Sequence, residues 1–248
     1  MMRLLQRILS FRAMKILGVI TARGGSRGLP RKNVRSLRGK PLIEYTIQAA
    51  LAAVDVFHRV IVSTEDAEIA EVSRRAGADV PFMRPQELAR DSTLTLPVLQ
   101  HAVEYIERCD GVAIDWVMIL QPTSPLRTKE DIQTAVKLAA AGDCDTVVSV
   151  QRANNCHPHK MKKMDSAGRL VPFIDGSVEP VRRQDLTPDA YQRNGAIYLV
   201  RRDRLLENRL YGDSISAYIM PDDRSVDIDT HVDFLLAEAL LSCRIGGG

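Results

Sequence analysis

The chain has 248 residues, of which 45% are hydrophobic and 26% charged, and its formal net charge is +3. These values are typical of an ordinary globular protein with one large domain, or a domain and an appendage, that needs no disulfide staples. No apolar run is long enough to cross a membrane, and the net charge is too small to argue for nucleic acid, so we expect neither as a partner.

The first 13 residues form a basic, amphipathic stretch ahead of a second possible start at Met14. They contain neither a long apolar segment nor a cleavage site of small residues, so a secretory signal is not expected. This N-terminal extension is either a surface helix or an upstream start that the working protein does not need. Residues 14–248 are then predicted to form one domain.

A short apolar run leads into a glycine-rich, strongly basic turn within residues 15–44. Ile16–Ile20 is predicted to be a buried strand, and Gly24, Gly25 and Gly28 let the following backbone turn tightly and approach a ligand. Eight cationic side chains precede the first acid of this stretch: Lys15, Arg23, Arg27, Arg31, Lys32, Arg35, Arg38 and Lys40. Backbone N–H groups and cations together favour an anion, and we interpret the turn as a triphosphate site. The alternative is an ordinary basic surface turn.

Helices and strands alternate after this turn. Helices are predicted at Pro41 to about Ala53, Asp66–Ala76, about Thr95–Arg108, Lys129–Ala141 and about His231–Cys243, and strands at Val60–Ser63, Trp116–Leu120, Thr146–Val150, Gly195–Val200 and Ala217–Met220, with another short apolar run at Val80–Met83. Strands separated by helices imply a mainly parallel sheet in an α/β fold. Because ligands bind at the carboxyl ends of such strands, we expect Thr21–Asn33, Ser63–Asp66 and Gln121–Arg127 to share one edge.

The alternation breaks between about Arg152 and Tyr191, where the chain is polar and has no helical period. A structureless loop of this length is uncommon in a compact domain. We therefore expect an insertion with its own strands, a lid or a subunit contact.

The four cysteines are scattered, without a CxxC pair or the spacing of a metal site: Cys109, Cys144, Cys156 and Cys243. This pattern favours unpaired thiols in a reducing compartment, and we expect a cytoplasmic protein.

Two carboxylates stand two residues apart at Asp227 and Asp229. In an extended segment such residues point the same way and can meet one cation. Magnesium commonly takes one or two carboxylates together with phosphate oxygens and water, so the pair is a candidate Mg²⁺ site. The alternative is that Asp229 or Thr230 caps the last helix, with Asp233 in place of the usual capping-box glutamate.

Three other segments carry polar groups with open interpretations. In the loop of residues 121–127, two prolines stiffen the backbone, and Gln121, Thr123, Ser124 and Arg127 are candidates to face a ligand. The segment of residues 84–95 is either a binding element or a connector that caps the next helix through Asp91, Ser92 or Thr93. Arg183 is either a clamp for a carboxylate or a solvated side chain.

Six motifs, in this order, closely resemble those of the CMP-sialic acid synthetases, also called acylneuraminate cytidylyltransferases: TARGGSRGLPRKN, IEYT, RPQELA followed by DST, LQPTSPLR, YQRNGAIY and DIDT. The resemblance runs from about Lys15 to Leu241. It implies a doubly wound, nucleotidyltransferase-like α/β domain with a small inserted dimerisation arm at about residues 152–191, and therefore a homodimer.

The resemblance also implies roles for individual residues. The CTP-binding positions would be Arg23, Gly24, Gly25, Ser26, Arg27, Lys32, Asn33, Arg84 and Thr95, the sugar-binding positions Gln121, Lys160, Arg183 and Tyr198, the metal ligands Asp227 and Asp229, and the catalytic residues Arg23, Lys32 and Asp229. Lys160 would be delivered across the dimer, and Arg183 would meet the sugar carboxylate. The chain departs from the family pattern at Arg27, where the family often has lysine, and at Thr95, where it has serine. The spacing between Arg183 and Asn194 is also one residue longer than expected for the family. Leu210 and Tyr211 stand where neuraminate enzymes tend to carry an aromatic pair, which leaves the sugar open.

The implied reaction is transfer of CMP from CTP to the 2-hydroxyl of a nonulosonic acid, with release of pyrophosphate and with Mg²⁺ as cofactor. Positioning and charge neutralisation carry such transfers, and we assign no protein general base. N-acetylneuraminate or a close relative is the first expectation, and legionaminic acid or Kdo is the alternative. A non-catalytic nucleotide or RNA binder is more distant, because aromatic residues amount to only 5% and the aspartate pair would have no role.

Overall fold

The computed structural model describes residues 14–25, 28–90, 92–142, 144–153, 156–176 and 182–245, without the side chains of Arg183 and Ile245. The predicted extension of residues 1–13 lies outside this part of the chain, as do the nucleotide-site candidates Ser26 and Arg27. All four cysteines are described and are free thiols, as expected.

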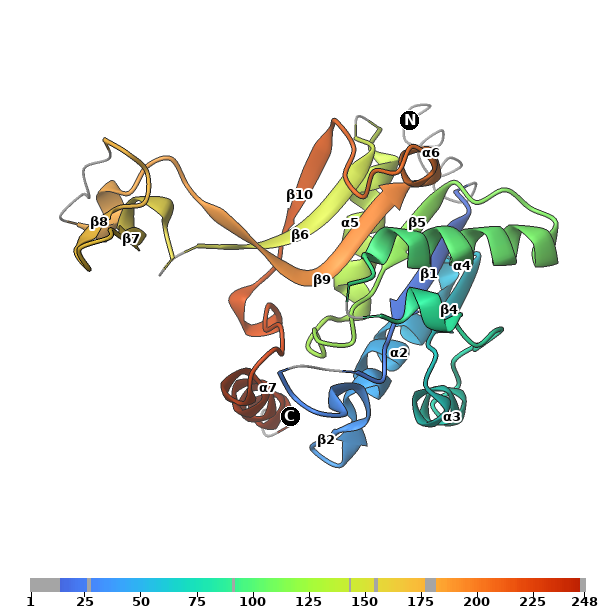
Figure 1. Cartoon of the computed structure of the whole chain (residues 1–248). Helices are drawn as coiled ribbons and strands as arrows, with labels where there is room; N and C mark the ends of the chain where they lie inside the picture. The colour runs from blue at the N-terminus through green and yellow to red at the C-terminus, as the bar shows by residue number, and fades with distance from the viewer. Residues whose placement is uncertain are drawn as a thin grey trace.

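A six-stranded sheet with the order β10-β6-β9-β5-β1-β4 forms the centre of the molecule (Figure 1). Its strands are β1 (Ile16–Thr21), β4 (Arg59–Ser63), β5 (Trp116–Ile119), β6 (Thr146–Arg152), β9 (Tyr191–Arg201) and β10 (Ile215–Ile219). Strand β1 pairs in parallel with β4 and β5, and β10 pairs in parallel with β6. Only β9 runs antiparallel to its neighbours in this sheet, β5 and β6. The prediction of a mainly parallel sheet is confirmed.

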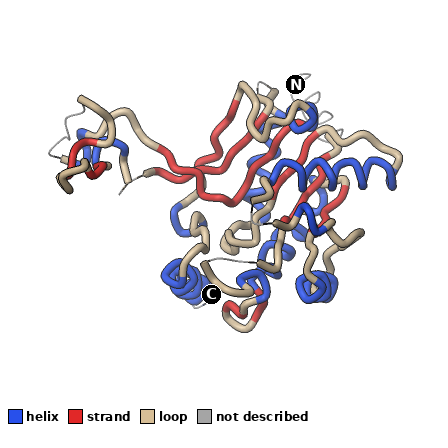
Figure 2. The backbone as a smooth tube through the Cα atoms, viewed as in Figure 1, coloured by secondary structure: helices blue, strands red, loops and turns tan. Residues whose placement is uncertain are grey.

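Helices cover both faces of the sheet (Figure 2), as expected of a doubly wound fold. One core joins the sheet to α2 (Leu42–Ala52), α3 (Ala67–Arg75) and α5 (Lys129–Ala140), and the other joins it to α4 (Thr95–Asp110) and α6 (Arg202–Leu206). Successive residues of a strand point to opposite faces, so Ile16 and Ile20 of β1 enter the first core while Leu17 and Val19 enter the second.

The helices begin and end close to the predicted positions because their ends carry the expected signals. The side chain of Asp66 accepts a hydrogen bond from the N–H of Ile69 at 2.9 Å and caps α3. Thr128 and Asp131 form a capping box at the start of α5. At residues 80–83, in contrast, there is no strand, and the neighbouring Asp79 makes only an isolated parallel bridge with Ile61.

A third, smaller core joins the basic turn to the C-terminal helix α7 (His231–Ile245). It contains Leu29 from the turn, Leu126 from the loop after β5, Ile228 from the aspartate segment (residues 227–229) and Phe234 from α7. The basic turn also includes the 3₁₀ helix η1 (Lys32–Val34) and the small hairpin of β2 (Ser36–Leu37) and β3 (Lys40–Pro41). This core therefore fixes three loops from distant parts of the chain against one another.

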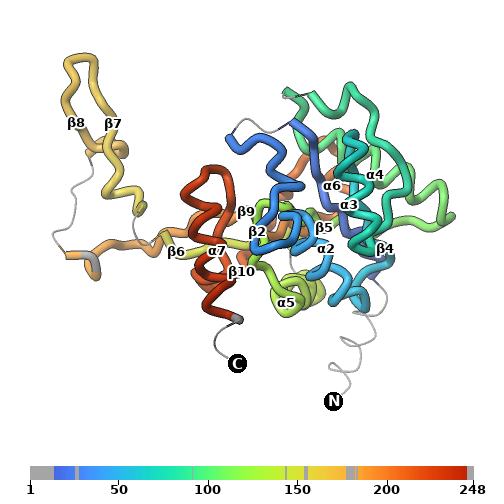
Figure 3. The backbone as a smooth tube through the Cα atoms, turned by 90° about the horizontal axis from the view of Figure 1, so that it is seen from below, coloured from blue at the N-terminus to red at the C-terminus, as the bar shows by residue number. Residues whose placement is uncertain are grey.

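The stretch between β6 and β9 projects from the body as an arm, seen in Figures 1 and 3. It carries the 3₁₀ helix η4 (Pro158–Lys160), a hairpin of β7 (Lys162–Met164) and β8 (Leu170–Pro172), and the 3₁₀ helix η5 (Arg183–Asp185). Among the described helices, none combines the length and the apolar character needed to span a membrane.

Candidate functional site

The loops that follow β1, β4 and β5 meet at the carboxyl edge of the sheet, as predicted. Two hollows of about 300 and 390 Å³ lie at this edge. The first hollow is lined by residues that include Arg84, Arg90, Thr93 and Thr95. The second hollow is lined by residues that include Gly25, Lys32, Asn33, Gln121, Thr123, Tyr198, Asp227 and Asp229. Thr21 and Arg23 line both. The structure thus brings most of the predicted nucleotide, sugar and metal residues to one place.

The basic turn is held in place by acceptors on neighbouring loops. The N–H of Gly24 donates to Glu65 Oε1 at 2.7 Å, and the buried side chain of Asn33 donates to the carbonyl of Arg23 at 2.9 Å. Gly28 lies so close to the segment before α7 that a Cβ atom there would be 2.3 Å from the carbonyl oxygen of Asp229. The amide of Gly24 is therefore engaged within the protein, whereas Gly25 has open space beside it and lines the second hollow.

Lys32 joins this turn to the aspartate segment. Its ammonium donates to the carbonyl of Ile228 at 2.6 Å and to Asp229 Oδ1 at 3.0 Å. The lysine side chain is mostly buried, whereas that of Asp229 is 75% exposed. A cation and a carboxylate from opposite ends of the chain thus face the same hollow.

Asp227 occupies a different environment from Asp229. Burial raises the pKa of Asp227, a hydrogen bond from Thr123 opposes this shift, and the charge of Asp229 adds to it. Its Oδ1 atom is buried and has no hydrogen-bond partner among the described residues. Unpaired buried carboxylate oxygens are costly, so this atom is a candidate ligand for a cation.

Gly195 of β9 allows this arrangement. Its φ of 75° is in the left-handed region, and a Cβ atom there would lie 2.6 Å from Asp227 Oδ2 and 3.0 Å from Gln121 Oε1. Any side chain at this position would displace the carboxylate, the amide or both.

The capping of α7 is carried out by the neighbours of Asp229. The N–H of Thr230 donates to Asp233 Oδ2 at 2.7 Å, and the N–H of Asp233 donates to Thr230 Oγ1 at 3.3 Å, which is a capping box. The capping interpretation is therefore correct for Thr230 and Asp233. The carboxylate of Asp229 takes no part in this cap; it pairs with Lys32 and lines the second hollow.

The aspartate pair fits a magnesium ion. Two carboxylates line one hollow, and one of their oxygens is buried without a partner. The described residues contain no cluster of three or more histidine, cysteine, aspartate or glutamate side chains suited to a metal. A pair leaves positions open for phosphate oxygens and water, which is how proteins commonly bind Mg²⁺ with a nucleotide.

Arg84 and Thr95 form part of the first hollow, but Arg84 is not a free cation. Its buried guanidinium donates to Ser63 Oγ at 3.1 Å, to the carbonyl of Ala22 at 3.2 Å and to the carbonyl of Ser63, and burial lowers its pKa. Arg84 therefore braces the loops after β1 and β4. Thr95 begins α4, whose N-cap is Leu94 without a side-chain hydrogen bond, so capping by Ser92 or Thr93 is wrong, and Asp91 lies outside the described residues.

The loop after β5 separates into two kinds of residue. Gln121 and Thr123 line the second hollow, whereas Ser124 and Arg127 are buried. Arg127 donates to the carbonyl of Ala196 at 2.6 Å and to Thr46 Oγ1 at 2.9 Å, and burial lowers its pKa to about 10. The expectation that Ser124 and Arg127 face a ligand is therefore wrong, because both support the loop from inside.

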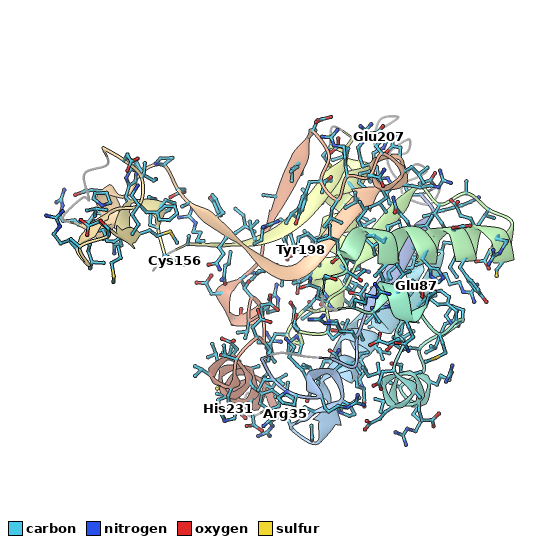
Figure 4. All side chains as sticks on the ribbon, in the orientation of Figure 1. Arg35, Glu87, Cys156, Tyr198, Glu207 and His231 are labelled. Carbon is cyan, nitrogen blue, oxygen red and sulfur yellow. The ribbon has the colours of Figure 1, made fainter. Side chains whose placement is uncertain are left out.

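The predicted sugar residues are only partly assembled within one chain. Tyr198 lies at the bend of β9 (Figure 4) and lines the second hollow beside Gln121, and burial raises its pKa. Its ring centroid is 6.2 Å from that of Tyr211. Lys160 and the backbone of Arg183 belong to the arm, in η4 and η5, and Lys160 does not line either hollow.

Sequence reasoning missed the individual roles of Glu65 and Gly195. Glu65 holds the basic turn, and its Oε2 is buried without a hydrogen-bond partner among the described residues, 3.7 Å from Arg84 Nη1. The available signal was its position in the chain: Glu65 lies two residues after the end of β4, which ends at the predicted ligand edge. No comparable signal marked Gly195, because its role depends on a contact with a residue 32 positions away along the chain.

The chain matches the family model described as Cytidylyltransferase over residues 17–217. It is 36% identical to CMP-N,N'-diacetyllegionaminic acid synthase of Legionella pneumophila, over 92% of this chain and 97% of that protein. It is 35% identical to N-acylneuraminate cytidylyltransferase of Escherichia coli, over 90% of this chain but only 51% of that longer protein. A solved structure of CMP:2-keto-3-deoxy-manno-octonic acid synthetase complexed with CTP shares the fold, with a TM-score of 0.66 and 20% identity over 93% of this chain and 99% of that one.

Proposed function

The chain belongs to the CMP-sialic acid synthetase family of cytidylyltransferases, and we propose that it transfers CMP from CTP to the 2-hydroxyl of a nonulosonic acid, with release of pyrophosphate. The observation that carries this proposal is the pair of hollows that share Arg23. A nucleoside in the first hollow and a sugar acid in the second would place the triphosphate between them, against the basic turn. Relatives that make CMP-sugars of this class support the same reaction.

The protein groups have distinct tasks in this reaction. Arg23 and Lys32 provide positive charge for the triphosphate and for the departing pyrophosphate, where negative charge develops. Gln121 and Tyr198 also line the second hollow, where their hydrogen-bonding groups would orient the sugar acid. Fixing both substrates in one geometry supplies much of the catalysis.

Asp227 and Asp229 would hold Mg²⁺ in the second hollow. When bound there, the ion would neutralise phosphate charge and polarise oxygens of the reacting groups. The buried, unpartnered Oδ1 of Asp227 supports this assignment, as does the freedom of the Asp229 carboxylate from the helix cap. Lys32, which is bound to Asp229, lines the same hollow, where it would meet the phosphates.

The working form is proposed to be a cytoplasmic homodimer in which the arm of one protomer brings Lys160, and Arg183, to the site of the other. Within one chain Lys160 belongs to η4 of the arm, which projects from the body in Figure 3, and it lines neither hollow. A partner's arm therefore offers a way for this residue to reach a sugar acid.

The acceptor is proposed to be N-acetylneuraminate or an acylated relative such as legionaminic acid. The relatives in the comparisons include synthases for both kinds of product. Tyr211 lies beside Tyr198, whereas Leu210 packs into the core of the α4 face rather than adding a second aromatic ring. We propose that Tyr211, beside Tyr198 of the second hollow, helps to distinguish the two acceptors.

A substrate panel tests the proposal. Pyrophosphate release is measured with CTP, ATP, GTP and UTP, each with N-acetylneuraminate, legionaminic acid, Kdo or no sugar. We expect release only with CTP, Mg²⁺ and a nonulosonic acid together, because the two hollows must both be filled. Equal turnover with ATP, or no turnover with any sugar acid, would contradict the proposal.

A further inference from the structure

A single buried carboxylate, that of Asp131, joins three elements of the chain. The N–H of Thr128 donates to its Oδ2 at 2.8 Å and caps α5, and the hydroxyl of Tyr218 in β10 donates to its Oδ1 at 2.6 Å. Arg224 binds both oxygens, with Nη2 donating to Oδ1 at 2.8 Å and Nε to Oδ2 at 3.0 Å. Burial opposes the charge of Asp131, but the hydrogen bonds from Arg224 and Tyr218 outweigh it and lower the pKa. The carboxylate is therefore held in its charged form.

Arg224 belongs to the stretch of chain that carries the two candidate metal ligands. It ends the 3₁₀ helix η6 (Asp222–Arg224), on the stretch that joins β10 to α7 (Figure 1). Asp227 and Asp229 follow it by three and five residues. The forked ion pair between Arg224 and Asp131 therefore anchors this stretch to α5 just before the candidate ligands.

The same carboxylate also fixes the loop against which Asp227 lies. As the cap of α5, Asp131 holds the end of the loop after β5, which carries Thr123. The side chain of Thr123 donates a hydrogen bond to Asp227, and its carbonyl accepts one from the N–H of Ile228 at 2.8 Å. Asp131 is thus linked to Asp227 by two routes, one through Arg224 and one through the loop of Thr123.

A second ion pair in the chain has the same forked geometry but no such link. Arg202 donates to Glu107 through two hydrogen bonds, at 2.6 and 2.7 Å, and joins the start of α6 to α4. Neither of these residues lines either hollow. Loss of either pair should cost stability, whereas only the pair of Asp131 and Arg224 is connected to the candidate metal ligands.

We propose that Asp131 and Arg224 are positioning residues for the Mg²⁺ site of Asp227 and Asp229. Two carboxylates that face one hollow repel each other until a cation binds, so their stretch of chain must be held from outside the pair. Groups behind the direct metal ligands commonly control metal affinity in this way. The inference rests on the proposed function and adds two residues to it that line neither hollow.

Binding of Mn²⁺ tests the proposal without turnover. Mn²⁺ takes the same carboxylate and water ligands as Mg²⁺, and the EPR signal of the free ion measures how much the nucleotide-free protein binds. Asp227→Asn identifies the binding that belongs to this site. We expect Arg224→Ala and Asp131→Asn to weaken that binding by roughly 10-fold or more. Arg224→Lys, which keeps the charge but not the fork, should weaken it less.

Two variants control for a general loss of stability. Tyr218→Phe removes a donor from the same carboxylate but lies on β10, before the stretch that carries the candidate ligands, and Arg202→Ala breaks the comparison pair. Both should lower the melting temperature and leave Mn²⁺ binding unchanged. Arg224→Ala should in addition raise the Mg²⁺ concentration needed for half-maximal turnover, while its binding of CTP without metal stays that of the wild type.

The possible failures are distinguishable. Wild-type Mn²⁺ affinity in folded Arg224→Ala and Asp131→Asn would overturn the proposal, and so would an equal loss in Tyr218→Phe or Arg202→Ala. If Arg224→Ala does not fold, Arg224→Lys and Asp131→Asn decide by the same criterion. A wild type that binds Mn²⁺ through Asp227 but is inactive with every sugar acid would contradict the proposed reaction and leave this test of the positioning residues intact.

Discussion

Asp227 and Asp229 are two residues apart but have different physical roles. Asp227 is buried, and its raised pKa records the cost of carrying a charge there without a cation. Asp229 is exposed and already paired with Lys32. The sequence predicted that the two carboxylates share a site, because alternate residues of an extended segment point the same way. It did not predict their different burial, which depends on Gly195 of β9 and on Thr123 of the loop after β5.

Substitution of either aspartate by asparagine should therefore affect the stability of the fold and the turnover of the enzyme differently. The pKa of Asp227 is raised in the folded protein, so the related stability is fully present below the ordinary aspartate pKa and is lost as pH rises through the folded value. Without Mg²⁺, Asp227→Asn should melt at a higher temperature than the wild type at mildly alkaline pH, and this difference should narrow on acidification. Thermal unfolding at several pH values measures it, and an equal or lower melting temperature throughout would contradict the assignment.

The same variants test the metal site. With Mg²⁺ and CTP, we expect Asp227→Asn and Asp229→Asn to lose roughly 10²-fold in turnover, about 2.7 kcal/mol, because each removes a charge where the phosphates are neutralised. Mg²⁺ should also stabilise the wild type against heat more than either variant. Asp222→Asn changes an exposed acid of the 3₁₀ helix η6 (Asp222–Arg224) and serves as the control. Near-normal turnover of Asp229→Asn at limiting Mg²⁺ would show that this carboxylate is not a metal ligand.

At the scale of elements, β9 does most to shape the second hollow. It runs antiparallel between β5 and β6, so its early residues lie at the carboxyl ends of the parallel strands. Its pairing with β6 shifts register between Val148 and Val150, close to Gly195. The apolar pattern predicted a strand here, but side-chain alternation is the same in both strand directions and cannot show that β9 is reversed. The sequence also showed no sign of the register shift or of the contact between Gly195 and Asp227, because both depend on residues far apart along the chain.

Substituting two glycines with similar φ angles distinguishes the effect of backbone strain from the effect of displacing the Asp227 carboxylate. Gly195 has φ 75° and abuts Asp227, whereas Gly168, in the arm hairpin, has φ 77° and no atom within 4 Å of an added Cβ. Both Gly195→Ala and Gly168→Ala should destabilise the protein by about 1 kcal/mol from backbone strain. Only Gly195→Ala should also lower turnover, by roughly 10-fold or more, because it moves Asp227. Turnover at saturating CTP with thermal unfolding is the measurement, and equal turnover of the two variants would contradict the role of Gly195.

At the scale of the whole molecule, local pattern predicted the order of helices and strands, and the motifs predicted which loops form the site. The contacts that complete the site join distant positions, such as Lys32 with Asp229 and Gly24 with Glu65. These depend on the topology of the sheet and on the third core, for which the sequence has no local signal. The direction in which the arm projects is likewise set by the long strands β6 and β9, so Lys160 could be assigned to the site only by resemblance.

The central claim is that the 2-hydroxyl of a nonulosonic acid attacks the α-phosphorus of CTP. It is tested most directly by labelling that hydroxyl with ¹⁸O and following the label by mass spectrometry after reaction with CTP and Mg²⁺. The account predicts a CMP-sugar that retains the label in the bond between sugar and phosphate, together with unlabelled pyrophosphate. Release of pyrophosphate without formation of a CMP-sugar, or a CMP-sugar that lacks the label when the substrate has kept it, would contradict the account.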